Sequence, residues 1–185
     1  GWQPIMYQYF TEELLKCPNA PASEEAKALV MDFVDTLTGK QTIFQCIRLG
    51  EEVARFGGTP EEPLVYKTEY LRRLMERIGE RREALRHGAD PTPYLVPGIR
   101  ELLQALCDEG IQCHLTSGTD EVDVIEEARL LGVDRYFAGI HGATDQNSTA
   151  CSKEQVIRSL LEEKKMQGGE LLSFGDGYVE MGLTR

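Results

Sequence analysis

The amino-acid sequence predicts an α/β fold, with an all-helical domain over residues 1–90 and a doubly wound parallel sheet over residues 91–185. Two observations support this division. Apolar residues in the first half recur three and four positions apart, as they do along one side of a helix. After Pro97, short apolar runs alternate with amphipathic stretches, which is the pattern of strands that alternate with helices. With 41% hydrophobic residues, the chain can bury a substantial core.

The first half contains three clearly predicted helices. The stretch 24–37 carries a helical apolar stripe that stops at Gly39, and the stretch 42–56 carries another that stops at Gly57. A long charged stretch, 61–88, has apolar residues along one side. Its arginines are Arg72, Arg73, Arg77, Arg81, Arg82 and Arg86. We interpret them as a solvated face paired with glutamates of the same helix, in preference to an anion site.

Helices and strands are predicted to alternate after residue 97. The predicted elements are a helix at 99–109, a strand at 111–115, a helix at 121–131, a strand at 136–140, a helix at 153–166 and a strand at 171–174. Strands separated by helices in this way form a parallel sheet with right-handed crossovers.

Composition excludes several classes of partner. The net charge of −11 argues against nucleic acid, whose phosphates need clustered Lys and Arg. No apolar run is long enough to span a bilayer, and the N-terminus lacks both the basic region and the apolar core of a signal peptide. We therefore expect a cytoplasmic protein with no membrane partner.

Cysteine and histidine spacing gives no sign of a disulfide framework or a zinc site. The five cysteines are odd in number and include no C-x-x-C pair, which is typical of reduced thiols. The three histidines, at positions 87, 114 and 141, are scattered and show no metal-ligand spacing.

A candidate metal site follows the last predicted strand. The apolar run 171–174 leads directly into Gly175-Asp176-Gly177, and Glu180 follows four residues after Asp176. Ligands of open α/β sheets sit outside the carboxyl ends of the strands. Two carboxylates at that edge, with glycine allowing close approach of the backbone, suit Mg²⁺, which prefers oxygen ligands. The alternative is an ordinary acidic turn from a strand into a helix.

Two upstream segments predict an anion site. Thr116, Ser117 and Gly118 follow the strand at 111–115, where a hydroxyl and turn N–H groups before a helix would cradle an anion. The alternative is a plain helix cap at Thr119 or Asp120. Lys153 opens the helix at 153–166, where a positive charge is unfavourable for the helix dipole. It suits a phosphate, although a surface lysine is the commoner explanation.

In this order and spacing, the three segments resemble the haloacid dehalogenase (HAD) superfamily of phosphatases and phosphomutases over residues 92–182. The resemblance implies that Thr116 binds phosphate, that Lys153 balances the charge of the nucleophile and phosphate, and that both are catalytic. It implies that Asp176 and Glu180 hold Mg²⁺, with Glu in place of the usual second Asp. The helical first half resembles the cap of the phosphoglycolate phosphatase and β-phosphoglucomutase branch, and residues 91–185 resemble its Rossmann-like core.

The activity implied by the resemblance is Mg²⁺-dependent hydrolysis of a small phosphorylated metabolite through an aspartyl-phosphate. A phosphomutase, or a HAD-like domain that binds without turnover, is the alternative. Lys40 and Gln41 are candidate cap contacts, although a role in starting a helix is simpler.

The family's first motif, D-x-D-G-T, is not present in the sequence. The nearest string runs from Met31 to Leu37, but its acids, Asp32 and Asp35, are three positions apart and its pattern is helical. We therefore expect the first strand and the nucleophile upstream of residue 1, and we expect these 185 residues alone to be inactive.

Overall fold

The structure is a computed structural model that describes residues 1–143, 153–165 and 167–175. The chain divides into two compact units. One comprises Gly1–Arg77 together with Lys164–Arg185, and the other comprises Ile78–Glu163. The helix α4 (Pro63–Arg86) begins in the first unit and ends in the second. The domain boundary predicted at residue 90 stays a prediction.

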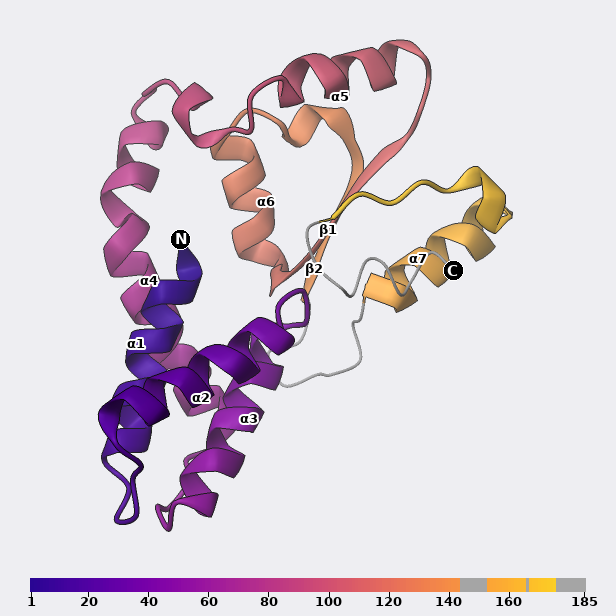
Figure 1. The fold of residues 1–185 in the computed structure, drawn as a ribbon. Helices are drawn as coiled ribbons and strands as arrows, with labels where there is room; N and C mark the ends of the chain where they lie inside the picture. Colours follow the sequence, from indigo (N-terminus) through magenta and orange to yellow (C-terminus); the bar gives the residue numbers. More distant parts are fainter. Residues whose placement is uncertain (144–152, 166, 176–185) are drawn as a thin grey trace. The chain divides into compact units, whose positions relative to one another are not determined.

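The unit formed by residues 1–77 is helical. Its helices α1 (Trp2–Leu15), α2 (Ser23–Thr36) and α3 (Thr42–Arg55) pack against one another (Figure 1). Phe10, Leu14, Val30 and Leu49 are fully buried between them, and burial of each such side chain contributes about 1.5–3 kcal/mol. The helices predicted at 24–37 and 42–56 are confirmed, because their apolar stripes face this core.

Asp32 and Asp35 lie within α2 rather than at the end of a strand. The Tyr7 hydroxyl on α1 donates a hydrogen bond to the Asp35 carboxylate, and the Gln3 amide donates a second one at 3.3 Å. Asp35 therefore joins two helices, and this string does not supply the strand-end carboxylates of a first motif.

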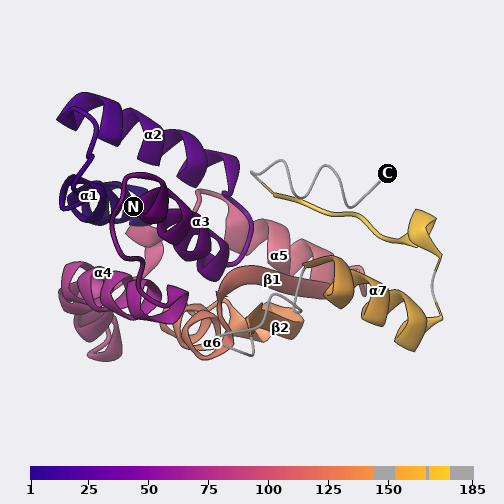
Figure 2. The same ribbon diagram turned by 90° about the horizontal axis from the view of Figure 1, so that it is seen from below.

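The unit formed by residues 78–163 contains a parallel pair of strands (Figure 2). After η1 (Thr92–Tyr94), its elements are α5 (Ile99–Asp108), β1 (Cys113–Asp120), α6 (Glu121–Leu130), η2 (Asp134–Tyr136), β2 (Phe137–Ala143) and α7 (Lys153–Lys164). The strands predicted at 111–115 and 136–140 are confirmed as parallel neighbours. Within the described residues the sheet has these two strands, so the larger Rossmann-like sheet and the cap stay predictions.

The register gives the two faces of this sheet different characters. Leu115 pairs with Ile140, and both pack with Leu103 of α5 and Ala128 of α6. The helices α5 and α6 therefore cover the same face. Because neighbouring residues of a strand point to opposite faces, the other face carries His114 and Thr116 of β1 and their partners Gly139 and His141 of β2.

The strand predicted at 171–174 does not form. After η3 (Gly168–Glu170), residues 171–175 have no regular secondary structure, and Leu172 and Phe174 are 77% and 78% exposed. A strand needs a neighbour to satisfy its N–H and C=O groups. No segment of the described residues pairs with this one, so its apolar pattern alone does not make it a strand.

The arginines of α4 follow the predicted pairing only in part. Arg72 pairs with Glu69 and Glu76 of its own helix, as predicted. Arg82 instead reaches Glu126 of α6, and the side chains of Arg81 and Arg86 also pair with α6. These partners lie 40 to 46 positions away in the sequence. Arg86 also pairs with Glu83 of its own helix, as predicted. The interpretation of a face paired within its own helix was therefore wrong for Arg81 and Arg82 and incomplete for Arg86.

Candidate functional site

Thr116 lies midway along β1, at the point after which the pairing becomes irregular. Thr116 pairs with His141 and Asp120 pairs with Ala143, so three residues of β1 lie opposite the single residue Gly142. Such a bulge re-aims backbone groups at the edge of a sheet and is frequent beside active sites. The strand continues to Asp120, so the prediction that it ends at residue 115 and gives way to a turn was wrong.

Ser117 and Gly118 lie inside this bulge. The N–H of Thr119 donates a hydrogen bond to the Ser117 hydroxyl at 3.2 Å, which closes a local turn. Asp120 then occupies the N-cap position of α6, but its side chain makes no capping hydrogen bond. The helix N-cap predicted at Thr119 or Asp120 is thus confirmed in its position, but not as a side-chain hydrogen bond. The bulge keeps Thr116, Ser117 and Gly118 together immediately before a helix N-terminus.

Gly142 holds the end of β2 against the start of α6. Its N–H donates to the Glu121 carboxylate at 3.2 Å, and a Cβ at this position would lie 2.4 Å from the Glu121 Cα. Only glycine permits this approach. The sequence reasoning missed Glu121 and Gly142, although a glycine near a strand end is a known sign of close backbone approach.

The start of α6 is acidic. Asp120, Glu121 and Asp123 all lie at its N-terminus, where negative charge is favourable for the helix dipole. The same carboxylates repel an incoming phosphate. A phosphate at Thr116 therefore needs a cation close by.

The structure describes only part of the predicted site. Lys153 is the first residue of α7, as predicted, and belongs to the same unit as Thr116. The predicted metal ligands, Asp176 and Glu180, lie outside the described residues. No group of three or more His, Cys, Asp or Glu side chains among the described residues could hold a metal ion.

Two histidines that look scattered in the sequence are neighbours in space. His114 Nδ1 lies 3.3 Å from His141 Nε2, and the ring planes differ by 22°. The register of β1 and β2 brings them together across the strands, beside Thr116. The expectation of scattered histidines was therefore wrong for this pair, and only the strand pairing could have revealed it.

The cap contacts predicted at Lys40 and Gln41 differ in exposure. Gln41 is buried at the N-cap position of α3, whereas Lys40 is exposed and its ammonium lies 5.9 Å from the Phe44 ring. The position of Gln41 fits the simpler role at the start of a helix. A role in substrate contact stays a prediction.

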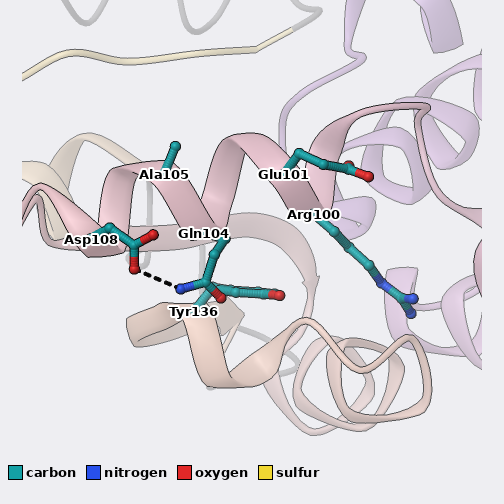
Figure 3. Close-up of a pocket in the computed structure, with 6 residues that line it drawn as sticks. All are labelled: Arg100, Glu101, Gln104, Ala105, Asp108 and Tyr136. Carbon is teal, nitrogen blue, oxygen red and sulfur yellow. Dashed lines mark hydrogen bonds between the residues drawn. The ribbon is translucent and has the colours of Figure 1, made fainter.

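A shallow pocket occurs on α5, away from the predicted site. It is lined by Arg100, Glu101, Gln104, Ala105, Asp108 and Tyr136 (Figure 3). Gln104 donates to Asp108 at 2.8 Å. Tyr136 directly precedes β2, so the pocket lies toward the amino ends of the parallel strands, whereas ligands of such sheets bind at the carboxyl ends. We do not assign the active site to it.

The cysteines that the structure describes are free thiols. They are Cys17, Cys46, Cys107 and Cys113, and burial raises the pKa of Cys46 to about 12. Within the described part of the chain, no helix combines the length and apolarity needed to cross a membrane.

Comparison with known proteins identifies the family. The sequence profile of the haloacid dehalogenase-like hydrolases matches residues 30–182, which include β1, α7 and the segment with Asp176 and Glu180. The chain belongs to this family. The predicted resemblance is thereby confirmed at the level of the superfamily, while the branch within it is not determined. The fold class is accordingly α/β.

One curated relative is a 5′-nucleotidase from Pseudomonas aeruginosa. It is 31% identical over 104 residues, which cover 56% of this chain and 47% of the relative. The matched region thus spans about half the length of that protein.

Proposed function

We propose that the protein is a Mg²⁺-dependent phosphatase that hydrolyses a small phosphorylated metabolite. Membership of the HAD-like hydrolases over residues 30–182 carries this proposal. The bulge after Thr116 supports it, because it gathers a hydroxyl and backbone groups at the edge where α/β sheets bind ligands. In the order found here, the family's phosphate, lysine and acidic segments correspond to Thr116, Lys153 and Asp176 with Glu180.

Each described residue would have a distinct task. The Thr116 hydroxyl and the backbone N–H groups at Ser117 and Gly118 would donate hydrogen bonds to phosphoryl oxygens, where charge builds up in the transition state. Lys153 would offset the negative charge of the phosphate and the attacking carboxylate. Gly142 and Glu121 would keep the bulge in place by holding the end of β2 against α6.

The donor set fits Mg²⁺. Asp176 and Glu180 offer carboxylate oxygens, which are the ligands that this cation prefers. The carboxylates at the start of α6 give a further reason for a cation, because without one they would repel phosphate. When bound, Mg²⁺ would neutralise charge on the phosphoryl group.

The reaction would proceed in two displacements. A carboxylate from a first motif, which is not among these residues, would attack phosphorus as the bond to the leaving oxygen breaks and that oxygen takes up a proton. Water would then cleave the aspartyl-phosphate and release phosphate. The 5′-nucleotidase relative makes nucleoside 5′-monophosphates the first substrates to test, beside sugar phosphates.

The test is release of inorganic phosphate by the full-length polypeptide that carries this sequence. With Mg²⁺ present, we expect turnover of a generic phosphomonoester and a selective response in a panel of nucleoside and sugar phosphates. Asp176→Asn should abolish the Mg²⁺-dependent turnover while the fold stays intact. Asp108→Asn, an exposed acid on α5, is the matched control and should not alter it.

The hydroxyl of Thr116 can be tested by a pair of variants. Thr116→Val should lower kcat by about 100-fold, the usual cost of losing one such donor, whereas Thr116→Ser keeps the hydroxyl and should lose far less.

Undiminished turnover in Asp176→Asn would refute the metal assignment. Binding of Mg²⁺ and beryllofluoride without any hydrolysis would refute the phosphatase and favour a binding domain.

A further inference from the structure

The His114–His141 pair is the most unusual polar feature outside the proposed phosphatase residues. Both side chains are half-buried, and both lie on the face of the sheet opposite the core formed with α5 and α6. The ring centroids are 5.6 Å apart while the two nitrogens are 3.3 Å apart, so the nitrogens lie on the facing sides of the rings. The two rings share a hydrogen bond when one of these nitrogens carries the proton and the other accepts it.

The spacing of these nitrogens also matches two ligands of one metal ion. Bonds of about 2.0–2.1 Å from Zn²⁺ to imidazole nitrogen, set at the tetrahedral angle, separate the two nitrogens by about 3.3–3.4 Å. The observed separation is 3.3 Å. An ion could therefore replace the shared proton at the same separation of the two nitrogens.

Gly139 leaves room at the place where the two nitrogens converge. It pairs with His114 and lies two positions before His141, on the same face. A Cβ at residue 139 would lie 2.9 Å from His114 Nδ1 and 2.7 Å from His141 Nε2. Any larger residue would push the imidazoles apart, so the glycine is required for the pair itself.

The geometry points to a second cation site, in which His114 and His141 bind a transition metal ion such as Zn²⁺, Co²⁺ or Ni²⁺ above Gly139. Imidazole suits these ions and not Mg²⁺, which takes oxygen ligands. The site is therefore chemically distinct from the proposed Mg²⁺ site and does not depend on phosphatase activity. The protein supplies two ligands, because no larger group of ligands exists among the described residues. Water fills the remaining positions, so the site is open to an additional ligand.

The test uses the untagged protein, freed of metal by a chelator and titrated with Co²⁺ and then Zn²⁺ by calorimetry. With Mg²⁺ in excess to occupy the proposed site at Asp176 and Glu180, we expect one further site, and we expect His114→Ala and His141→Ala each to weaken binding by more than about tenfold, since even the loss of an outer-shell partner costs 10–100-fold. His87→Ala removes an exposed histidine that directly follows α4 and should leave affinity unchanged. Mg²⁺ in excess should not compete.

Two further variants separate this site from other donors. Gly139→Ala keeps both histidines but should abolish binding by filling the space between them. Cys113→Ser alters a thiol on the opposite face and should change neither affinity nor the absorption spectrum of the Co²⁺ complex.

If a variant fails to fold, NMR spectra of the protein without substitutions still test the proposal. In ¹H–¹⁵N spectra, Zn²⁺ should shift the imidazole nitrogen signals of His114 and His141 and leave those of His87 in place. Equal affinity in His141→Ala, or the absence of these shifts, would overturn the proposal and leave a hydrogen-bonded pair only.

Discussion

Replacing Arg82 with methionine should lower the free energy of unfolding by about 2 kcal/mol. Arg82 lies on α4 with only 6% of its side chain exposed, and it reaches the carboxylates of Glu126, Asp123 and Glu127 on α6. Asp123 lies at 3.6 Å and Glu127 at 3.9 Å. Methionine keeps most of the buried stem and removes the charge, so the variant isolates the electrostatic contribution.

The magnitude follows from the unequal exposure of the partners. Breaking a fully buried ion pair costs about 3–5 kcal/mol, because one charge is left without a partner. Here the carboxylates that lose Arg82 are 27–39% exposed and can regain water. An exposed pair contributes at most about 1 kcal/mol. The expected loss therefore lies between these limits, and Arg81 and Arg86 still pair with α6.

Urea unfolding followed by far-UV circular dichroism measures this loss. With a slope of about 2 kcal/mol per M, the midpoint should fall by about 1 M. Arg72→Met is the matched control, because Arg72 lies on the same helix but is exposed and pairs only within it, so its midpoint should stay unchanged. If Arg82→Met and Arg72→Met gave the same midpoint, the interhelical pairing would contribute nothing and the reasoning would be wrong.

Three further predictions concern packing and titration. Gly142→Ala should destabilise the protein by about 1–3 kcal/mol through overpacking against Glu121, whereas Gly79→Ala on α4, where nothing lies within 4 Å of an added Cβ, should not destabilise it; equal stabilities would contradict the close approach. Iodoacetamide should modify exposed Cys107 long before Cys46, because burial raises the Cys46 pKa to about 12, and peptide mass spectrometry showing equal rates would refute this. Burial and the hydrogen bond to Asp35 raise the pKa of Tyr7 from 10.0 to about 12. Protonated Tyr7 therefore adds stability below pH 10 that is lost as the pH rises toward 12; ultraviolet titration should show a lower pKa in Asp35→Asn, and no change would contradict the contact.

The helices of the first half could be predicted because their apolar spacing is local information. Val30, Phe33 and Val34 define the buried side of α2 in the sequence, and they are buried in the structure. The ion pairs of Arg72 are local too, since both partners lie within one turn. Predictions of this kind need no knowledge of how segments pair.

Features that depend on long-range pairing could not be predicted. Arg82 finds its partners on α6, and His114 meets His141 only because β1 and β2 pair in one particular register. The run 171–174 is apolar enough for a strand, but a strand also needs a neighbour, and sequence pattern does not supply one. The hydroxyl of Thr116 directly after an apolar run was visible in the sequence, whereas the continuation of β1 and the bulge that follows Thr116 arise from unequal lengths of paired backbone.

The central claim is that Thr116, Lys153 and Asp176 surround one phosphoryl site that requires Mg²⁺. A crystal structure of the full-length polypeptide grown with Mg²⁺ and beryllofluoride tests it most directly. We predict the fluoride ligands within hydrogen-bonding distance of the Thr116 hydroxyl and the Lys153 ammonium, with the Asp176 carboxylate on the cation. An anion bound elsewhere, or these three side chains at separate places, would contradict the account.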